Sequence, residues 1–327
     1  MSMKSVSRRC AVACLLVAGA WSGTAWADEA YPNRPIRIVV PVAPGFNTDN
    51  LARLLAEELR KNMKIQVIVE NKAGGAGGSV GADYVARSKP DGYTLLFSSP
   101  GPLGVNKVLY KELGYDPLAF TPISLTSEST NVLLVRAEAP FQSIKELVAF
   151  AKANPGKLNY GSGGVGTSTH LSSELFKTQT GTDIVHVPFK GSAATVTGLM
   201  SGQVDMFFGE LGMSLPHIKS GRLRALGVGS LARHELLPDV PSVSEVLPGF
   251  TSTVWYGVVA PPATPKDIVD KLSAWTVQVM KQPEIQARIR DLGGHVIARP
   301  SAEFGKFMKD DLAYWQKVIV DAKIPRQ

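Results

Sequence analysis

The chain has 327 residues, of which 44% are hydrophobic and 19% are charged, and its formal net charge is +7. The charges are scattered without a block of Lys and Arg, which argues against a nucleic-acid-binding protein and is compatible with a mild attraction for anions. Two residues are cysteines, Cys10 and Cys14, and both lie near the N-terminus.

The first 27 residues have the pattern of a secretory signal peptide. Basic residues at Lys4, Arg8 and Arg9 precede an apolar run over 11–20, and Ala25-Trp26-Ala27 fits the small-x-small rule for cleavage. The apolar run is shorter than the roughly 20 residues that span a bilayer, which argues against a membrane anchor. We therefore expect cleavage after Ala27 and a mature protein in the periplasm.

Cleavage at this position would remove both cysteines, so the mature chain could form no disulfide. The cysteines also precede most of the apolar run, which argues against a lipoprotein. Removing 27 of the 327 residues takes three positive charges from the net charge of +7 and leaves +4. A chain of this length buries roughly 75% of its unfolded surface and usually forms two domains.

Short apolar runs alternate with helical patterns along the chain. Strands are predicted, in chain order, at residues 36–42, 65–70, 94–98, 132–135, 158–161, 184–187, 204–208, 223–228, 254–259 and 295–298. Helices are predicted at residues 49–61, 80–87, 144–153, 168–178, 193–200, 213–219, after Thr264-Pro265, 283–292 and 301–322. A capping box, Ser143-Ile144-Lys145-Glu146, marks the start of the third helix.

This alternation predicts an α/β fold with mainly parallel sheets and flanking helices. The tail after the strand at 254–259 has three helices and one short strand, which is a poor core on its own. It would better complete an earlier domain, although two sequential domains remain an alternative. The first option predicts a discontinuous domain of residues 28–126 and 253–327, and a second domain of residues 127–252.

The segment Pro44-Gly45-Phe46-Asn47-Thr48-Asp49 joins the first predicted strand to the first helix. In an open α/β sheet, ligands bind beyond the carboxyl ends of the strands. The N-terminus of a helix offers unpaired N–H groups that suit an anion. The segment could equally be an ordinary turn with Asn47 or Thr48 as the N-cap residue.

A glycine-rich loop at residues 161–170 occupies the same kind of position between a strand and a helix. Its glycines would let a ligand approach the backbone, and Ser162, Thr167 and Ser168 add hydroxyl groups. The loop also matches the G-x-G-x-x-G pattern of dinucleotide sites. The export signal argues against a nicotinamide enzyme, and anion binding by N–H groups explains the same glycines. His170 could bind a ligand or cap the loop.

A possible enzyme signal is Gly77-Gly78-Ser79-Val80-Gly81, which matches the nucleophile elbow G-x-S-x-G. An elbow places its serine directly after a buried strand, whereas residues 72–76 separate Ser79 from the preceding strand. The histidines do not single out a base. A secreted serine hydrolase that uses Ser79 is therefore the less favoured interpretation.

Other polar residues near predicted strand ends are ambiguous. Lys190 could bring positive charge to a cleft or be solvated on the surface. Asp205 is expected to be structural, and Glu210 could meet a ligand amine, a hydroxyl or water. No spacing of His, Asp and Glu indicates a metal site, and we expect neither a metal nor a cofactor.

Several stretches together resemble the tripartite tricarboxylate transporter receptor family, also called the Bug family of extracytoplasmic solute receptors. They cover nearly the whole mature chain, and they are Tyr31-Pro32-Asn33-Arg34-Pro35-Ile36, Val69-Glu70-Asn71-Lys72-Ala73-Gly74-Gly75, Lys89-Pro90-Asp91-Gly92-Tyr93-Thr94-Leu95, the 161–171 loop, Val187-Pro188-Phe189-Lys190-Gly191-Ser192, Gly202-Gln203-Val204-Asp205 and Leu215-Pro216-His217-Ile218-Lys219-Ser220-Gly221.

The resemblance implies a two-lobed periplasmic-binding-protein (Venus flytrap) fold with two crossover segments. It implies a receptor, not an enzyme, that captures a small organic carboxylate for the membrane components of a tripartite tricarboxylate transporter. Loops 44–49 and 161–170 would hold carboxylate oxygens through N–H groups, hydroxyls and waters. The residues expected to bind the ligand are Gly45, Phe46, Asn47, Thr48, Asp49, Ser98, Ser99, Ser162, Gly163, Gly164, Gly166, Thr167, Ser168, His170, Lys190, Gly209 and Glu210.

The sequence departs from the family pattern at two of these positions. The family commonly has glycine where this chain has Phe46 and aspartate where it has Gly209. Phe46 could stack on an aromatic ligand or pack on an alkyl chain, and loss of the aspartate argues against an amino-acid ligand. We therefore expect an apolar-bodied mono- or dicarboxylate, with terephthalate as an aromatic example.

The resemblance also indicates how the receptor would work. Only a closed state would let both lobes contact the ligand, so binding would favour closure. We expect hinges near residues 124–129 and 252–256, with Trp255 in the core, and a monomeric protein. A ligand-sensing partner of a membrane signalling protein remains an alternative function.

Overall fold

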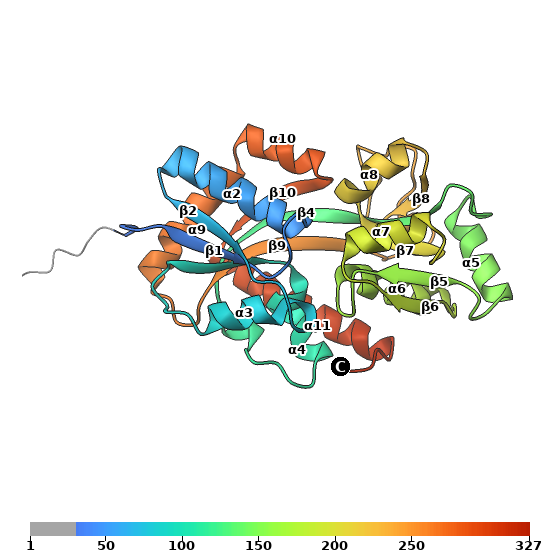
Figure 1. Ribbon diagram of the computed structural model, residues 1–327, viewed down its shortest axis with the longest axis horizontal. Helices are drawn as coiled ribbons and strands as arrows, with labels where there is room; N and C mark the ends of the chain where they lie inside the picture. The colour runs from blue at the N-terminus through green and yellow to red at the C-terminus, as the bar shows by residue number, and fades with distance from the viewer. Residues whose placement is uncertain (1–30) are drawn as a thin grey trace, which may run out of the picture. The chain divides into compact units, whose positions relative to one another are not determined.

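The computed structural model describes residues 31–327, and Arg34–Gln327 form one compact unit (Figure 1). The predicted signal peptide and its cleavage site lie outside the described residues. Within residues 31–327, no helix combines the length and the apolar character needed to cross a membrane.

One end of the sheet, here called the first lobe, contains the N-terminal βαβ units. Strand β1 lies between β2 and β3 and is parallel to both, with Ile38 opposite Val69 and Leu95. The strands of this lobe are β1 (Ile36–Val40), β2 (Val67–Asn71), β3 (Thr94–Ser98), β9 (Thr253–Ala260) and β10 (Gly294–Pro300). Its helices are α2 (Asn47–Met63), α3 (Ser79–Ala86), α4 (Asn106–Leu109), α9 (Lys266–Met280), α10 (Pro283–Asp291) and α11 (Ser301–Asp321).

The other end, the second lobe, is a smaller α/β unit in which β5 is parallel to β6 and β7. Its strands are β5 (Asn159–Ser162), β6 (Val185–Pro188), β7 (Met206–Glu210) and β8 (Leu223–Val228), and its helices are α5 (Ile144–Ala153), α6 (Ser168–Thr180), α7 (Ser192–Met200) and α8 (Leu211–Lys219). Helix α5 begins where predicted, because Ser143 Oγ accepts a hydrogen bond from the Glu146 N–H at 3.2 Å.

Strand β4 (Thr121–Arg136) joins the lobes and runs through both, as the long ribbon in Figure 1 shows. The strand order is β2-β1-β3-β9-β4-β7-β5-β6, and β8 and β10 also pair with β4. The pairings of β4 with β7, β8, β9 and β10 are antiparallel, so antiparallel strands connect the two parallel sets.

The sequence predicted only residues 132–135 of β4 as a strand and no element over residues 121–131. Residues 121–131 are instead extended strand. Their many Ser and Thr residues are buried rather than solvated, and Thr126 Oγ1 donates to the Tyr256 carbonyl at 2.9 Å. A Ser/Thr-rich segment is a turn signal only where water can reach it.

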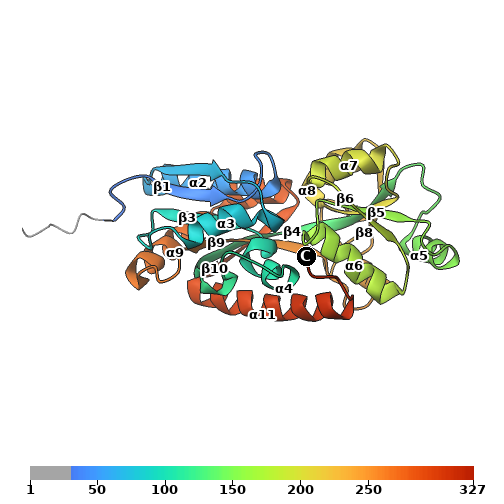
Figure 2. The same ribbon diagram turned by 60° about the horizontal axis from the view of Figure 1, so that its bottom comes forward.

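The C-terminal helix α11 packs against both lobes. It runs along the lower side of the molecule in Figure 2. Trp315, Val318 and Ile319 of α11 belong to the same buried cluster as Tyr160 and Phe176 of the second lobe. Phe304 and Met308 of the same helix pack with Val39 and Leu96 of the first lobe, so the C-terminal helix contributes to both cores.

Candidate functional site

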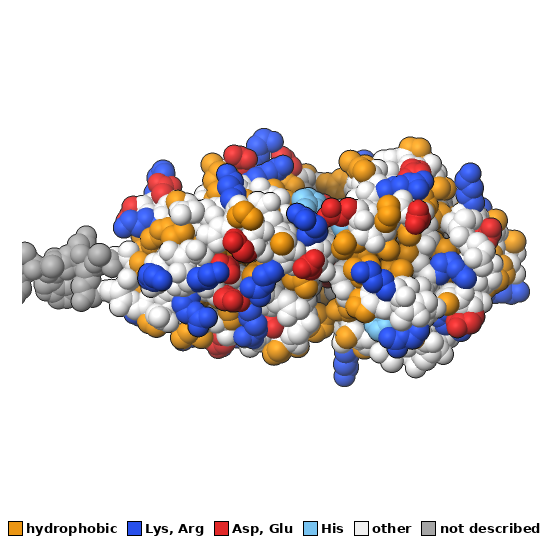
Figure 3. Space-filling model, turned by 90° about the horizontal axis from the view of Figure 1, so that it is seen from above, with side chains coloured by type: hydrophobic (Ala, Val, Ile, Leu, Met, Phe, Trp, Pro, Cys, Tyr) orange, Lys and Arg blue, Asp and Glu red, His pale blue; other side chains and the backbone are white. Residues whose placement is uncertain are grey.

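A cleft of about 840 Å³ is lined by residues from both lobes. Charged side chains of both signs are interspersed on the face that Figure 3 shows, so this surface has no patch of one sign. Among the described residues that line the cleft, Lys190 and Glu210 carry ionisable charges, and most other walls are small or apolar. An attraction for anions must therefore come mainly from the backbone around the cleft.

Four helices begin at this cleft. Thr48 of α2 and Gly78, the N-cap residue of α3, line it from the first lobe, while Ser168 of α6 and Ser192 of α7 line it from the second. First-turn N–H groups have no acceptor within their helix and carry partial positive charge. Four such ends around one cavity make it favourable for negative charge.

Phe46 is the N-cap residue of α2, and its ring reaches across the cleft to the second lobe. The ring lies against Gly191, the N-cap residue of α7. The Asp49 carboxylate holds the loop from behind, since it accepts the Gly45 N–H at 2.9 Å and pairs with Arg53 at 3.0 Å. Burial alone would raise the pKa of Asp49. The hydrogen bonds and the charge of Arg53 outweigh this effect, so that the net shift of the pKa is downward.

A hydrogen-bonded cluster lies around Glu210 at the end of β7. Glu210 Oε2 accepts from the Tyr256 hydroxyl and from Asn47 Nδ2, both at 2.7 Å. Asn47 Nδ2 also lies 3.1 Å from Ser129 Oγ. Burial raises the pKa of the Glu210 carboxyl, while the hydrogen bonds from Tyr256 and Asn47 act in the opposite direction. Both of these bonds go to Oε2, and Glu210 borders the cleft.

The glycine N–H groups of the 161–170 loop are engaged within the loop itself. The Gly163 N–H donates to Thr169 Oγ1 at 2.9 Å, and the Gly164 N–H donates to Ser162 Oγ at 3.2 Å. The Gly166 N–H donates to a ring nitrogen of His170. The free donors expected from this loop are therefore the N–H groups at the start of α6, where Ser168 lines the cleft.

Ser98 supplies a polar atom at the end of β3. Its Oγ is fully buried and has no hydrogen-bond partner among residues 31–327, and the residue borders the cleft. A buried hydroxyl without a partner is costly in a protein interior. Its neighbour Ser99 also borders the cleft.

Most of the predicted site residues border the cleft. These are Phe46, Thr48, Ser98, Ser99, Gly163, Gly164, Gly166, Thr167, Ser168, Lys190 and Glu210. Six others do not border it, namely Gly45, Asn47, Asp49, Ser162, His170 and Gly209.

These six residues support the walls instead. Gly45 and Asp49 bond to each other, and Asn47 holds Glu210. Ser162 and His170 accept N–H groups of the second loop. A Cβ at the buried Gly209 would lie 2.6 Å from the Phe207 ring, so this position has no room for a larger side chain without rearrangement. The acid of this wall is Glu210, one residue later.

The sequence missed several residues that line the cleft. Ser192 and the glycines at 74–78 lie in segments that were quoted for the family resemblance or for the nucleophile-elbow pattern. Their positions near helix starts were the signal that could have identified them as cleft residues. Tyr256 borders the cleft, whereas Trp255 is buried in the core as predicted. Tyr110 and Trp315 carry no local signal, since distant segments bring them to the cleft.

Ser79 lacks the setting of a nucleophile. It is the first residue of α3 and follows a short 3-10 turn, and β2 ends well before it at Asn71. A nucleophile elbow requires a direct strand-to-helix turn.

A family model described as "Tripartite tricarboxylate transporter family receptor" matches residues 51–324. The chain belongs to this receptor family. A UPF0065 protein in the tcbD-tcbE intergenic region of Pseudomonas sp. (strain P51) is 36% identical over 326 residues, covering 98% of this chain and 96% of that protein.

Two solved structures show how closely this receptor follows the family fold. R. palustris Rpa4515 with adipate is 33% identical, with a TM-score of 0.85 over 90% of this chain and 99% of that one. MatC (Rpa3494) from Rhodopseudomonas palustris with bound malate is 32% identical, with a TM-score of 0.81 over 88% and 100%. The predicted fold class is confirmed, as is the prediction of a binding receptor rather than an enzyme.

Proposed function

We propose that this receptor captures a small organic dicarboxylate with an apolar body in the periplasm and presents it to the membrane components of a tripartite tricarboxylate transporter. The observation that carries the proposal is the convergence of four helix N-termini, two from each lobe, on one cleft. Such an arrangement stabilises negative charge at two opposed walls.

The rest of the cleft favours an apolar ligand body. Its volume of about 840 Å³ suits a small molecule. Phe46, Val165, Val254 and Trp315 line it together with several Pro and Ala residues. The structures with adipate and malate belong to relatives of this receptor, and adipate has an apolar chain between two carboxylates. Terephthalate has the same two charges at the ends of an aromatic ring, against which Phe46 could stack.

Glu210 places a carboxyl group in a site proposed to bind anions, where an ionised carboxylate would repel the ligand. Protonation of Glu210 would remove this repulsion. The carboxyl is partly buried, and its pKa is raised by burial. Since Oε2 already accepts two hydrogen bonds, a proton on Oε1 would be free to donate to the ligand. A ligand carboxylate nearby would raise the pKa of Glu210 further. In this proposal, neutral Glu210 is therefore a hydrogen-bond donor to a carboxylate.

Domain closure would complete the site. In this proposal, residues 28–126 and 253–327 move against residues 127–252, with hinges near 124–129 and 252–256. These two segments are neighbours in the sheet, where Ser127 pairs with Tyr256 and Ser129 pairs with Val254. A small twist of this strand pair would change the width of the cleft without breaking either core.

A thermal-shift screen followed by calorimetry tests the ligand class. Terephthalate and adipate should raise the melting temperature, and malate, aspartate and glutamate should do so less. Stabilisation by aspartate or glutamate alone would reject the proposed ligand class.

Mass spectrometry of the protein from a periplasmic extract should find Asp28 as the first residue, and size-exclusion chromatography should find a monomer.

A further inference from the structure

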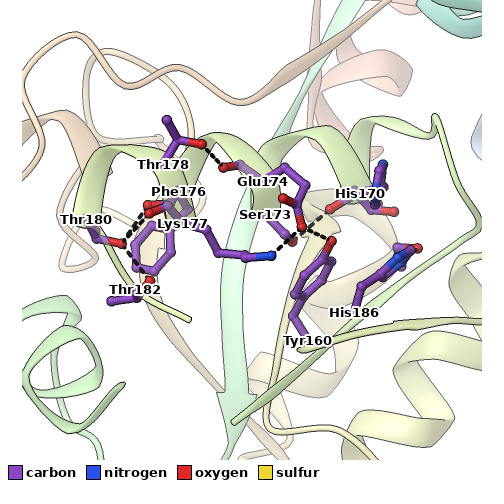
Figure 4. Close-up of polar contacts among 12 residues, drawn as sticks. Tyr160, His170, Ser173, Glu174, Phe176, Lys177, Thr178, Thr180, Thr182 and His186 are labelled. Atoms are coloured by element: carbon purple, nitrogen blue, oxygen red, sulfur yellow. Dashed lines mark hydrogen bonds and ion pairs between the residues drawn. The ribbon is translucent and has the colours of Figure 1, made fainter. Parts of the chain in front are cut away.

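Two histidines that do not border the cleft pack against each other next to the 161–170 loop, with their rings tilted by 38° (Figure 4). His170 comes from the first turn of α6 and His186 from β6, and their ring centroids lie 4.4 Å apart. The ring of Tyr160 stacks on His186 at 4.7 Å with an interplanar angle of 13°. His170 is only 4% exposed, so these rings form a packed layer beneath the loop.

Both histidines connect to N–H groups of the loop. His170 Nδ1 accepts the Gly166 N–H at 3.3 Å. His186 Nε2 lies 2.6 Å from Ser162 Oγ, and the same oxygen accepts the Gly164 N–H. Gly164 and Gly166 border the cleft and have φ angles of +126° and +80°, which favour glycine. Hydrogen bonds from behind therefore fix a backbone that has few steric restraints of its own.

The same segment contacts the first lobe. A Cβ on Gly166 would lie 2.4 Å from Leu109, and the Tyr110 hydroxyl donates to the Val165 carbonyl at 3.3 Å. A displacement of residues 163–166 would thus alter both the wall of the cleft and the contact between the lobes.

We propose that His170 and His186, with Ser162 between His186 and the loop, are positioning residues for ligand binding. They hold residues 163–166 so that the start of α6 faces the ligand. This inference rests on the proposed function of the cleft. The histidines do not touch the ligand in this arrangement, since they act through the backbone of the loop.

The mechanism requires His170 to be neutral, because a protonated Nδ1 cannot accept an N–H. The charged and titratable groups that face the pair are Glu174 and Lys177 of α6 and Tyr160 of β5. Tyr160 donates to Glu174, which also pairs with Lys177 at 2.8 Å. Burial lowers the pKa of His170 to about 4, and the neighbouring His186 and Lys177 lower it too, whereas Glu174 raises it.

The test uses calorimetry with terephthalate and adipate on the mature protein. His170→Leu removes the acceptor of the Gly166 N–H, and Ser162→Ala removes the acceptor of the Gly164 N–H. His170→Gln can replace the acceptor with its amide oxygen. We expect the first two variants to bind the probe about 10- to 100-fold more weakly, because each leaves a loop N–H without its partner. His170→Gln should stay within about threefold of the wild-type protein.

Thr180→Val is the matched control. Thr180 is buried at the opposite end of α6, where its hydroxyl donates to the Phe176 carbonyl (Figure 4). This substitution removes a hydrogen bond from the same helix far from the loop. It should lower the melting temperature without changing the affinity.

Amide hydrogen exchange without ligand separates this inference from the proposed function. Exchange in residues 163–166 should be faster in His170→Leu and Ser162→Ala and unchanged in Thr180→Val. Wild-type affinity or wild-type exchange in both loop variants would overturn the inference, and Ser162→Ala decides if His170→Leu does not fold. If neither probe binds the wild-type protein, the proposed ligand class fails, and the exchange measurement still decides the role of the histidines.

Discussion

The ring of Phe46 lies directly against the backbone of Gly191, because a Cβ built on Gly191 would be 2.5 Å from Cζ of Phe46. Gly191 also has a φ of +98°, so both its backbone conformation and its neighbour favour glycine. The two residues are the N-cap positions of α2 and α7. Their contact therefore brings together helix N-termini that belong to different lobes.

Phe46→Ala should weaken terephthalate binding by about tenfold, because the ligand loses an apolar wall and the lobes lose a contact in the closed state. Isothermal titration calorimetry measures this change. Phe150→Ala is a matched control, since Phe150 lies on α5 away from the cleft and is 37% exposed. Equal affinities of Phe46→Ala and the wild-type protein would show that Phe46 is not a wall of the binding site.

Ser168→Ala should cost about 1 to 3 kcal/mol of binding free energy, because it removes a hydroxyl donor to a carboxylate at the start of α6. The loss should be seen for adipate and terephthalate alike, since both would present a carboxylate there. Ser201→Ala changes an exposed serine at the end of α7 and should bind as the wild-type protein does. An unaltered affinity of Ser168→Ala would remove this hydroxyl from the site.

Glu210→Gln should flatten the pH dependence of stability above about pH 4.5, the ordinary pKa of the carboxyl. The pKa of Glu210 is raised from its ordinary value of 4.5, so its contribution to the free energy of unfolding is complete below about pH 4.5 and is lost as the pH rises through the folded-state pKa. Glutamine keeps the shape and cannot ionise. Urea denaturation from pH 4.5 to 8.5 should show that the free energy of unfolding of the variant rises relative to that of the wild-type protein as the pH rises. Glu112→Gln, at an exposed glutamate, should show no such gain.

Acid should destabilise the protein through His170. Its pKa is about 4 in the folded protein and 6.5 ordinarily, so the unfolded chain takes up a proton first as the pH falls. The stability that neutral His170 contributes is present above pH 6.5 and is lost between pH 6.5 and about pH 4, in a total on the order of 3 kcal/mol.

Urea denaturation at pH 7 and pH 4.5 measures this loss. It should be smaller in His170→Gln than in the wild-type protein. His295→Gln, at an exposed histidine of β10, serves as the control. An equal acid-induced loss in His170→Gln and the wild-type protein would contradict the assignment to His170.

The sequence identified the alternating strands and helices and the two main cleft loops because both signals are local. Apolar runs and glycine-rich strand ends depend on neighbouring residues in the chain. It could not identify Tyr110 or Trp315 at the cleft, because tertiary contacts between distant segments place them there. Nor could it show that glycine N–H groups are engaged by Ser162 and His170, since residue types do not specify which donor finds which acceptor.

The single strand β4 has a practical consequence for dividing the protein. Because β4 contributes paired backbone to both lobes, a cut between residues 126 and 127 would leave each fragment with only part of that strand. The edges of β3 and β9, which pair with each other in the intact protein, would then expose N–H and C=O groups that recruit foreign strands. Fragments expressed separately should aggregate, whereas co-expressed fragments should recover a soluble complex by re-forming the shared strand pairing.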